Sequence, residues 1–299
     1  MSLERLTACP LCKSGLFLNH SEVRDLSISK ELFFICRCTQ CGLLFTNPRP
    51  DQEEISRYYQ SEDYISHQNK SNNPINLIFK LVRYFTIRKK VKQLNYYSTK
   101  KGSLLDYGCG TGHFLKAAKA KGWKTTGIEP NEPARKMAKK SGIKVNDSLD
   151  SLKKSKPFDA ITLFHVIEHV HELRSTIKKL NRLLDAEGRL FLAVPNHHSF
   201  DARHYTAHWA AWDVPRHLYH FSPETMNYLA MEFEMEIIET LPMVFDSYYV
   251  SILSEKYSKP EKNSILNFIN GIILGQRSNK WAKENQNNYS SLLFILKKK

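Results

Sequence analysis

Residues 105–115 read Leu-Asp-Tyr-Gly-Cys-Gly-Thr-Gly-His-Phe-Leu, an apolar strand pattern that leads into three alternate glycines and then into a helix. Glycine suits such a turn because a side chain would keep a ligand away from the backbone and would exclude the dihedral angles of the turn. In open α/β sheets, ligands bind at this carboxyl end of the strands. A dinucleotide-binding loop has the pattern Gly-x-Gly-x-x-Gly, whereas His113 stands where the last glycine belongs. The stretch therefore predicts a ligand-binding loop and leaves the ligand open.

Strands and helices alternate on both sides of this loop. Apolar runs predict strands over 103–107, 125–129, 143–145, 158–164 and 188–194. Helical spacing predicts helices over 112–120, 133–140 and 173–184, and a further helix that starts at Ser222-Pro223. Two strands are expected in the tail, near 236–239 and 290–296, with a helical stretch between them. This order predicts a mainly parallel sheet with helices on both faces.

An acidic residue ends the second strand. Glu129 lies about 20 residues beyond Gly108, the separation expected of an acid that binds ribose hydroxyls. Its carboxylate can accept hydrogen bonds from both vicinal hydroxyls, and it would repel a phosphate at the same place. The sequence therefore predicts a nucleoside ligand.

With the stretches at 158–170 and 183–196, the glycine loop and Glu129 resemble the class I S-adenosylmethionine-dependent methyltransferases over about 103–196. The resemblance implies an α/β fold, with a Rossmann-like, doubly wound, seven-stranded sheet whose last strand is antiparallel. It also implies that an acid and three glycines cradle the methionine part of the cofactor, that Glu129 holds the ribose, that the end of the third strand meets the adenine, and that the end of the fourth faces the cofactor. The cofactor-binding residues expected from it are Asp106, Gly108, Gly110, Gly112, Glu129, Asn146, Asp147, Phe164 and His165.

Two Cys-x-x-Cys pairs stand near the N-terminus, Cys9 with Cys12 and Cys38 with Cys41. Four thiolates in two such pairs are typical of a closed, tetrahedral, structural Zn²⁺ site. A redox dithiol or two unmetallated pairs are the alternatives. We expect zinc, because the metal would supply folding energy that so small a module lacks in apolar core.

The chain divides into three zones on these patterns. Residues 1–50 form a zinc-ribbon-like module, 51–101 form a helical basic linker or cap, and 102–299 form the methyltransferase domain. Within the last zone we expect a lid or acceptor segment at about 197–222 and a helical insertion at about 260–285.

A zinc ribbon ahead of such a domain resembles a bacterial group that methylates small molecules, sugars or lipid-linked intermediates. The runs at 44–51 and 212–222 are also similar to that group. The resemblance implies a methyltransferase that acts by in-line methyl transfer on a small-molecule, sugar or lipid-linked acceptor.

Histidines gather in the second half of the chain, with nine of the 12 between positions 165 and 220. A histidine titrates near neutral pH, which suits it to remove a proton from an acceptor. The predicted candidates for a catalytic base are His217 or His220, followed by His165 and His169. These histidines could bind a second metal, but the sequence has no His-Glu-x-x-His or comparable spacing that would support it.

Composition narrows the class of protein. The 299 residues carry a net charge of +14 and are 41% hydrophobic, which excludes a disordered chain. No apolar run approaches the ~20 residues of a membrane-spanning helix, and the first ten residues lack a secretory pattern, so we expect a cytoplasmic protein. The positive net charge would suit an RNA substrate, so an RNA methyltransferase is the main alternative. The basic, helical pattern over 74–97 could also lie on a membrane surface. A non-catalytic binding module is the third class.

Overall fold

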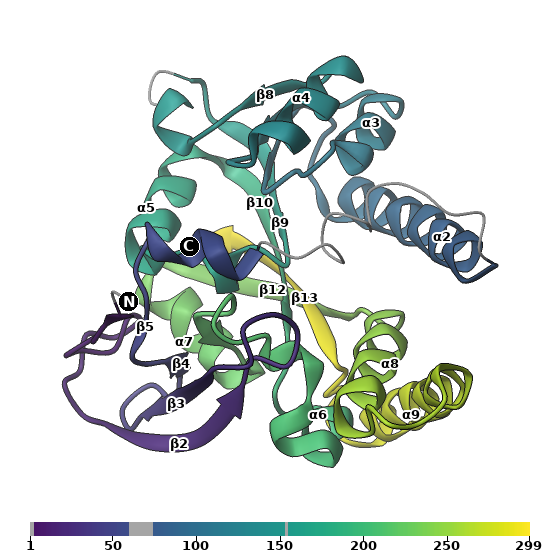
Figure 1. Ribbon diagram of the computed structural model, residues 1–299. Coiled ribbons are helices and arrows are strands. Elements are labelled where there is room, and N and C mark those ends of the chain that lie inside the picture. The colour runs from purple at the N-terminus through teal and green to yellow at the C-terminus, as the bar shows by residue number, and fades with distance from the viewer. Residues whose placement is uncertain (1–2, 60–73, 153–154) are drawn as a thin grey trace.

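The computed structural model describes residues 3–59, 74–152 and 155–299, and the side chains of 74–81 lie outside that description (Figure 1). A seven-stranded sheet forms its centre, with the strand order β12-β13-β10-β9-β6-β7-β8. The strands are β6 (Ser103–Tyr107), β7 (Lys124–Ile128), β8 (Lys144–Asn146), β9 (Phe158–Phe164), β10 (Leu184–Pro195), β12 (Met235–Pro242) and β13 (Ser291–Lys298). β13 pairs antiparallel with both β10 and β12, and the strands from β8 to β10 are mutually parallel. The predicted sheet with an antiparallel last strand is confirmed.

The two faces of the sheet have separate apolar cores, because alternate strand residues point to opposite sides. Leu104 packs with side chains of α2 (Pro74–Tyr97), α3 (His113–Lys119) and α4 (Glu132–Lys140). Leu105, the next residue, packs with side chains of α5 (Leu173–Leu183) and α7 (Pro223–Glu232). Helices on both faces make the sheet doubly wound, as the sequence predicts.

Short elements and a helical pair complete the chain. The 3₁₀ turns are η1 (Glu54–Tyr59), η2 (Leu149–Leu152), η3 (Ile167–His169), η4 (Thr206–His208) and η5 (Ala210–Trp212), and α6 is Phe200–Tyr205. α8 (Asp246–Ser258) packs on α9 (Ser264–Glu284), which covers the predicted helical insertion. Among the described residues, no helix is long and apolar enough to cross a membrane.

The N-terminal segment builds a second sheet together with two residues from the second half of the chain. Its strands are β2 (Phe17–Arg24), β3 (Leu32–Cys38) and β4 (Leu44–Thr46), and β11 (Tyr219–His220) adds to β4. A separate pair joins β1 (Leu3–Glu4) to β5 (Arg49–Pro50). This small sheet lies at the opposite end of the molecule from β8 and α4 (Figure 1). The predicted zinc module and the predicted acceptor segment therefore share one sheet.

Within the predicted linker, η1 and α2 are helical. Asp51 accepts hydrogen bonds from the backbone N–H groups of Glu53 and Glu54 and so caps η1. Residues 60–73 of that linker, and the side chains of 74–81, lie outside the described part of the chain. Farther along α2, Val91 is buried whereas Phe85 is 58% exposed.

A buried ion pair connects the turn before β11 to the end of β2. The guanidinium of Arg216 lies 3.0 Å from the carboxylate of Asp25, and the two side chains are 5% and 0% exposed. Arg216 also lies 2.6 Å from Asp213 and donates to the carbonyl of Tyr58. Asp25 belongs to the N-terminal module, so this arginine attaches the turn before β11 to that module. The carboxylate of Asp25 is fully buried.

We expect Arg216→Met to lower the free energy of unfolding by about 3 kcal/mol, because it leaves the buried carboxylate of Asp25 without its cation. Denaturant unfolding followed by circular dichroism measures the loss. Lys136→Met is the matched control, since it removes an exposed pair with Glu132, and its midpoint should stay where it is in the wild type. Equal midpoints for Arg216→Met and wild type would contradict the structural role of the pair.

Candidate cofactor-binding and active site

The glycine loop has the geometry that its sequence predicts. Gly108, Gly110 and Gly112 have φ values of +77°, +52° and +80°, a region that other residues rarely adopt. A Cβ on Gly108 would also lie 2.4 Å from Cγ2 of Val166, which packs directly against the loop. The residue must therefore be glycine for two independent reasons. The contact also brings the segment after β9 to the predicted cofactor loop.

Glu129 holds the loop from the neighbouring strand. One of its carboxylate oxygens accepts from the N–H of Gly110 and the other from the N–H of Asn131, each at 2.8 Å. Its own N–H donates to the carbonyl of Asn146 at 2.9 Å. The predicted ribose residue, the glycine loop and the end of β8, where Asp147 follows Asn146, therefore meet at one edge of the sheet. Each carboxylate oxygen keeps a second lone pair for a ligand hydroxyl.

Asp106 lies beneath the loop and is 4% exposed. Burial raises the pKa of this carboxyl group to about 7, although a hydrogen bond from Thr162, at 2.6 Å, favours its charged form. The chain runs from β6 outward to β7 and β8 on one side and returns to β9 on the other. The loop after β6 thus stands at the point where the strand order reverses, which is where open α/β sheets bind ligands.

Lys90 of α2 is a site residue that the sequence reasoning missed. Its Nζ lies 3.9 Å from the centroid of the Phe164 ring, at the end of β9. Burial lowers the pKa of Lys90, and the carboxylates of Asp246 and Asp106 oppose that change. The only signal in the sequence was a run of basic residues over 83–92, and that pattern is typical of a solvated helix face. Lys90 instead places a positive charge beside the predicted cofactor residues Phe164 and Asp106.

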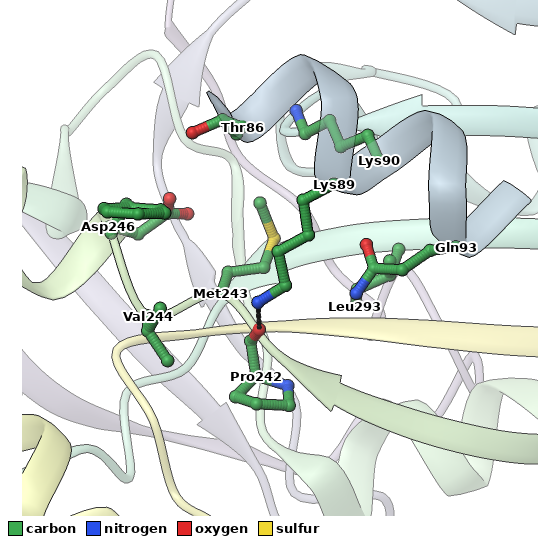
Figure 2. A pocket seen from close by; sticks show the side chains of 10 residues that line it. Thr86, Lys89, Lys90, Gln93, Pro242, Met243, Val244, Asp246 and Leu293 are labelled. Atoms are coloured by element: carbon green, nitrogen blue, oxygen red, sulfur yellow. Dashed lines mark hydrogen bonds between the residues drawn. The ribbon is translucent and has the colours of Figure 1, made fainter. Parts of the chain in front are cut away.

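A pocket opens between α2 and the turn from β12 to α8 (Figure 2). Thr86, Lys89, Lys90 and Gln93 line it from α2, and Pro242 to Asp246 line it from the turn. Nζ of Lys89 donates to the carbonyl of Pro242 at 3.3 Å across this opening. Asp246 therefore lines the pocket, and it also contacts His165, a predicted catalytic histidine.

His165 follows β9 directly and has a left-handed φ of +58°. Its Nε2 lies 2.9 Å from Oδ2 of Asp246, and its Nδ1 lies 3.5 Å from Oε1 of Glu168. Burial opposes a positive charge on the ring, but the two carboxylates outweigh it and raise the pKa of His165 to about 9. In most molecules His165 is therefore protonated at neutral pH. The fraction with a neutral ring, which can accept a proton, increases as the pH rises.

The other three predicted histidines lie together. The rings of His169 and His217 are 4.6 Å apart, and those of His217 and His220 are 6.5 Å apart. Burial lowers the pKa of His169 to about 4 and that of His220 well below its ordinary range. His220 is 4% exposed, and its Nε2 lies 3.3 Å from the hydroxyl of Thr46. His220, a residue of the small sheet, is therefore closed off from solvent.

The four predicted zinc ligands converge. Sγ of Cys9 lies 3.5 Å from that of Cys41, Sγ of Cys12 lies 3.4 Å from that of Cys38, and all four sulfur atoms lie within 4.8 Å of one another. Thiolates around a tetrahedral Zn²⁺ with Zn–S bonds of ~2.3 Å stand ~3.8 Å apart, so the cluster fits the metal. All four cysteines are free thiols.

Comparison with known proteins agrees with this geometry. Residues 81–240, more than half of the chain, match a family described as a methyltransferase domain. The chain therefore belongs to this methyltransferase family, and its fold is that of the class I S-adenosylmethionine-dependent enzymes.

Curated relatives include two ubiquinone biosynthesis O-methyltransferases. The one from Haemophilus ducreyi is 30% identical over 164 residues, which are 49% of this chain and 65% of the relative. The one from Pelagibacter ubique is 32% identical over 134 residues, which are 42% of this chain and 54% of the relative. The chain thus spans less than two thirds of the length of each.

Solved structures show the same fold at low sequence identity. Magnesium protoporphyrin IX methyltransferase from Synechocystis PCC 6803, with bound S-adenosylhomocysteine (SAH), aligns with a TM-score of 0.54 and 13% identity. The alignment covers 83% of this chain and all of that one. The plantazolicin methyltransferase BpumL, in complex with SAH, aligns with a TM-score of 0.50 and 16% identity over 81% of this chain and 93% of that one.

Proposed function

We propose that this protein transfers a methyl group from S-adenosylmethionine to a hydroxyl group of a small-molecule, sugar or lipid-linked acceptor. The observation that carries the proposal is the junction of Gly110, Glu129 and the end of β8 at one edge of the sheet. This junction offers backbone and carboxylate groups to a nucleoside. The names of the curated relatives support a hydroxyl acceptor on a small molecule.

The cofactor assignment extends to the remaining predicted residues. Asp106 and the three glycines would hold the methionine part, Glu129 the ribose, and Asn146 or Asp147 the adenine. Phe164 and Lys90 would border the sulfonium from the end of β9 and from α2, because the two side chains are in contact there. Lys90 carries the same sign of charge as the sulfonium, so cofactor binding requires its ammonium group to stay on the acidic side of the site, toward Asp246.

Among the four predicted histidines we assign the base to His165. It is the one that directly follows β9, next to the predicted cofactor residue Phe164. Asp246, at 2.9 Å, stabilises the imidazolium that a base becomes once it has taken a proton. The lone pair freed from the acceptor hydroxyl would attack the methyl group in line with the departing sulfur, and the enzyme contributes mainly by positioning the two.

We further propose that Cys9, Cys12, Cys38 and Cys41 bind a structural zinc ion. The geometry of the four sulfur atoms supports it, and so does the position of Cys9, Cys38 and Cys41 in the apolar core shared with the main sheet. The metal would fix the N-terminal module against α5 and α7 and would take no part in methyl transfer.

Glu129→Ala should weaken binding of S-adenosylmethionine roughly 10- to 100-fold, because a charged hydrogen-bond acceptor for the ribose is lost. Isothermal titration calorimetry measures the affinity. Glu132→Ala is the matched control, since that carboxylate is exposed and pairs with Lys136, and its affinity should equal that of the wild type. If Glu129→Ala also binds like the wild type, the ribose assignment is wrong.

Labelled methyl groups should pass from S-adenosylmethionine to a small-molecule and lipid extract and not to total RNA. His165→Gln should lower that transfer by ~100-fold or more, because it removes the base and keeps the volume of the side chain. His20→Gln, at an exposed histidine of the N-terminal module, is the control. Label that accumulates mainly in RNA would overturn the proposed acceptor class, and full activity of His165→Gln would overturn the base.

Cys12→Ser should remove one zinc equivalent per chain and lower the thermal midpoint, because a structural metal contributes directly to folding. Mass spectrometric metal analysis of protein dialysed against metal-free buffer measures the first effect. Cys36→Ser is the control, since Cys36 lies outside the four-cysteine cluster and its thiol donates to Asn19 and to the carbonyl of Asn47. Unchanged zinc content in Cys12→Ser would reject the assignment.

A further inference from the structure

A second group of metal-binding side chains lies outside the cysteine cluster. Glu168 and His169 belong to η3, just after β9, whereas His217 precedes β11. One ligand atom from each of the three lies within 4.8 Å of the other two. The N–H of Leu218 donates to the carbonyl of Glu168 at 2.8 Å. This backbone bond fixes the two segments to each other, so the three side chains meet through the fold and without any local spacing in the sequence.

The two imidazoles are held in the orientation of metal ligands. Nδ1 of His169 lies 3.0 Å from the carbonyl oxygen of Arg216, and Nδ1 of His217 lies 2.9 Å from that of Ala211. A carbonyl oxygen can only accept, so each Nδ1 carries the proton and each Nε2 keeps its lone pair. Metal-binding histidines usually donate their second ring N–H to such a group, which fixes the tautomer and the plane of the ring.

The surroundings of the two rings leave these lone pairs available. The hydroxyl of Tyr59 lies 3.0 Å from Nδ1 of His169, on the already protonated side of the ring. The nearest carboxylate to Nε2 of His217 is that of Asp213, at 3.9 Å, which is beyond hydrogen-bond distance. The other oxygen of Asp213 is bonded to Arg216.

Glu168 completes the group with a buried carboxylate. It is 0% exposed, and neither of its oxygens receives a hydrogen bond from any residue in the described ranges. The closest cation is the ring of His165, whose Nδ1 is 3.5 Å from Oε1. Buried carboxylates are ordinarily paired or bound to a metal, because an uncompensated charge is costly away from water. Both oxygens of Glu168 therefore keep lone pairs for a partner besides His165.

We propose that Glu168, His169 and His217 bind a divalent transition-metal ion, of which Zn²⁺ fits best. Two imidazoles and one carboxylate form a ligand set of the kind that zinc accepts in sites with three protein ligands. Three protein ligands leave a fourth position for water or for an oxygen of a bound molecule. His169 is half-buried, so the ion can enter from solvent. This site differs from the cysteine cluster in its nitrogen and oxygen ligands.

Substitution with Co²⁺ distinguishes the two sites. The full-length protein, stripped of metal under reducing conditions and titrated with Co²⁺ in the absence of S-adenosylmethionine, should bind two equivalents per chain. One equivalent should give the thiolate-to-cobalt charge-transfer band of the cysteine cluster. The other should give the weaker visible absorption of nitrogen and oxygen ligands, without that band.

Variants then assign the second equivalent. Glu168→Gln, which keeps the shape of the side chain, and His217→Gln should each lose the equivalent without thiolate character and keep the charge-transfer band, which also reports that the protein is folded. Cys12→Ser should show the reverse. His208→Ala, at an exposed histidine, should bind both equivalents.

Two results would overturn the proposal. One is a wild-type protein that binds a single equivalent with thiolate character, in which case a protonated imidazole neutralises Glu168. The other is a Glu168→Gln variant that still binds both equivalents. Neither result depends on methyl transfer or on cofactor binding, so the site stands or falls separately from the proposed function.

Discussion

The hydrogen bond from the N–H of Gly110 to the carboxylate of Glu129, 2.8 Å long, connects the two strand ends on which the rest of the site depends. It exists because the glycine loop can take left-handed angles and because β7 lies next to β6 in the sheet. The same carboxylate also accepts from Asn131, which begins the turn into α4. A nucleoside that binds here meets a loop and an acid that are already held in place, so little ordering is needed when it binds.

A second set of contacts builds the side of the molecule opposite α2. β11 pairs with β4, the pair of Arg216 and Asp25 is buried beside it, and the N–H of Leu218 bonds to the carbonyl of Glu168. The turn before β11 therefore touches both the cysteine module and the segment that follows β9.

Local features were predictable from the sequence, and features made by distant segments were not. The glycine loop, Glu129, the two cysteine pairs and the helix start at Ser222 each depend on residues within one strand, turn or cap. Ser222 caps α7 as predicted, with Thr225 completing the reciprocal hydrogen bonds. The residues assigned to the cofactor meet at one edge of the sheet, because the carboxyl ends of parallel strands do so.

The missed features all require tertiary contacts. Lys90 belongs to a basic helix face, and only the packing of α2 places its charge on Phe164. The group of Glu168, His169 and His217 has no characteristic spacing, since its members come from segments on either side of β10 and are joined by a backbone bond. The addition of β11 to the N-terminal sheet was likewise invisible, because a strand of two residues has no periodic pattern of its own.

The most direct measurement of the central claim is a crystal structure of the protein with S-adenosylhomocysteine. The account predicts the ribose hydroxyls on Glu129, the methionine part along the loop from Gly108 to Gly112, and the sulfur near Phe164. A nucleoside bound elsewhere, or a loop that binds a pyrophosphate instead, would contradict it.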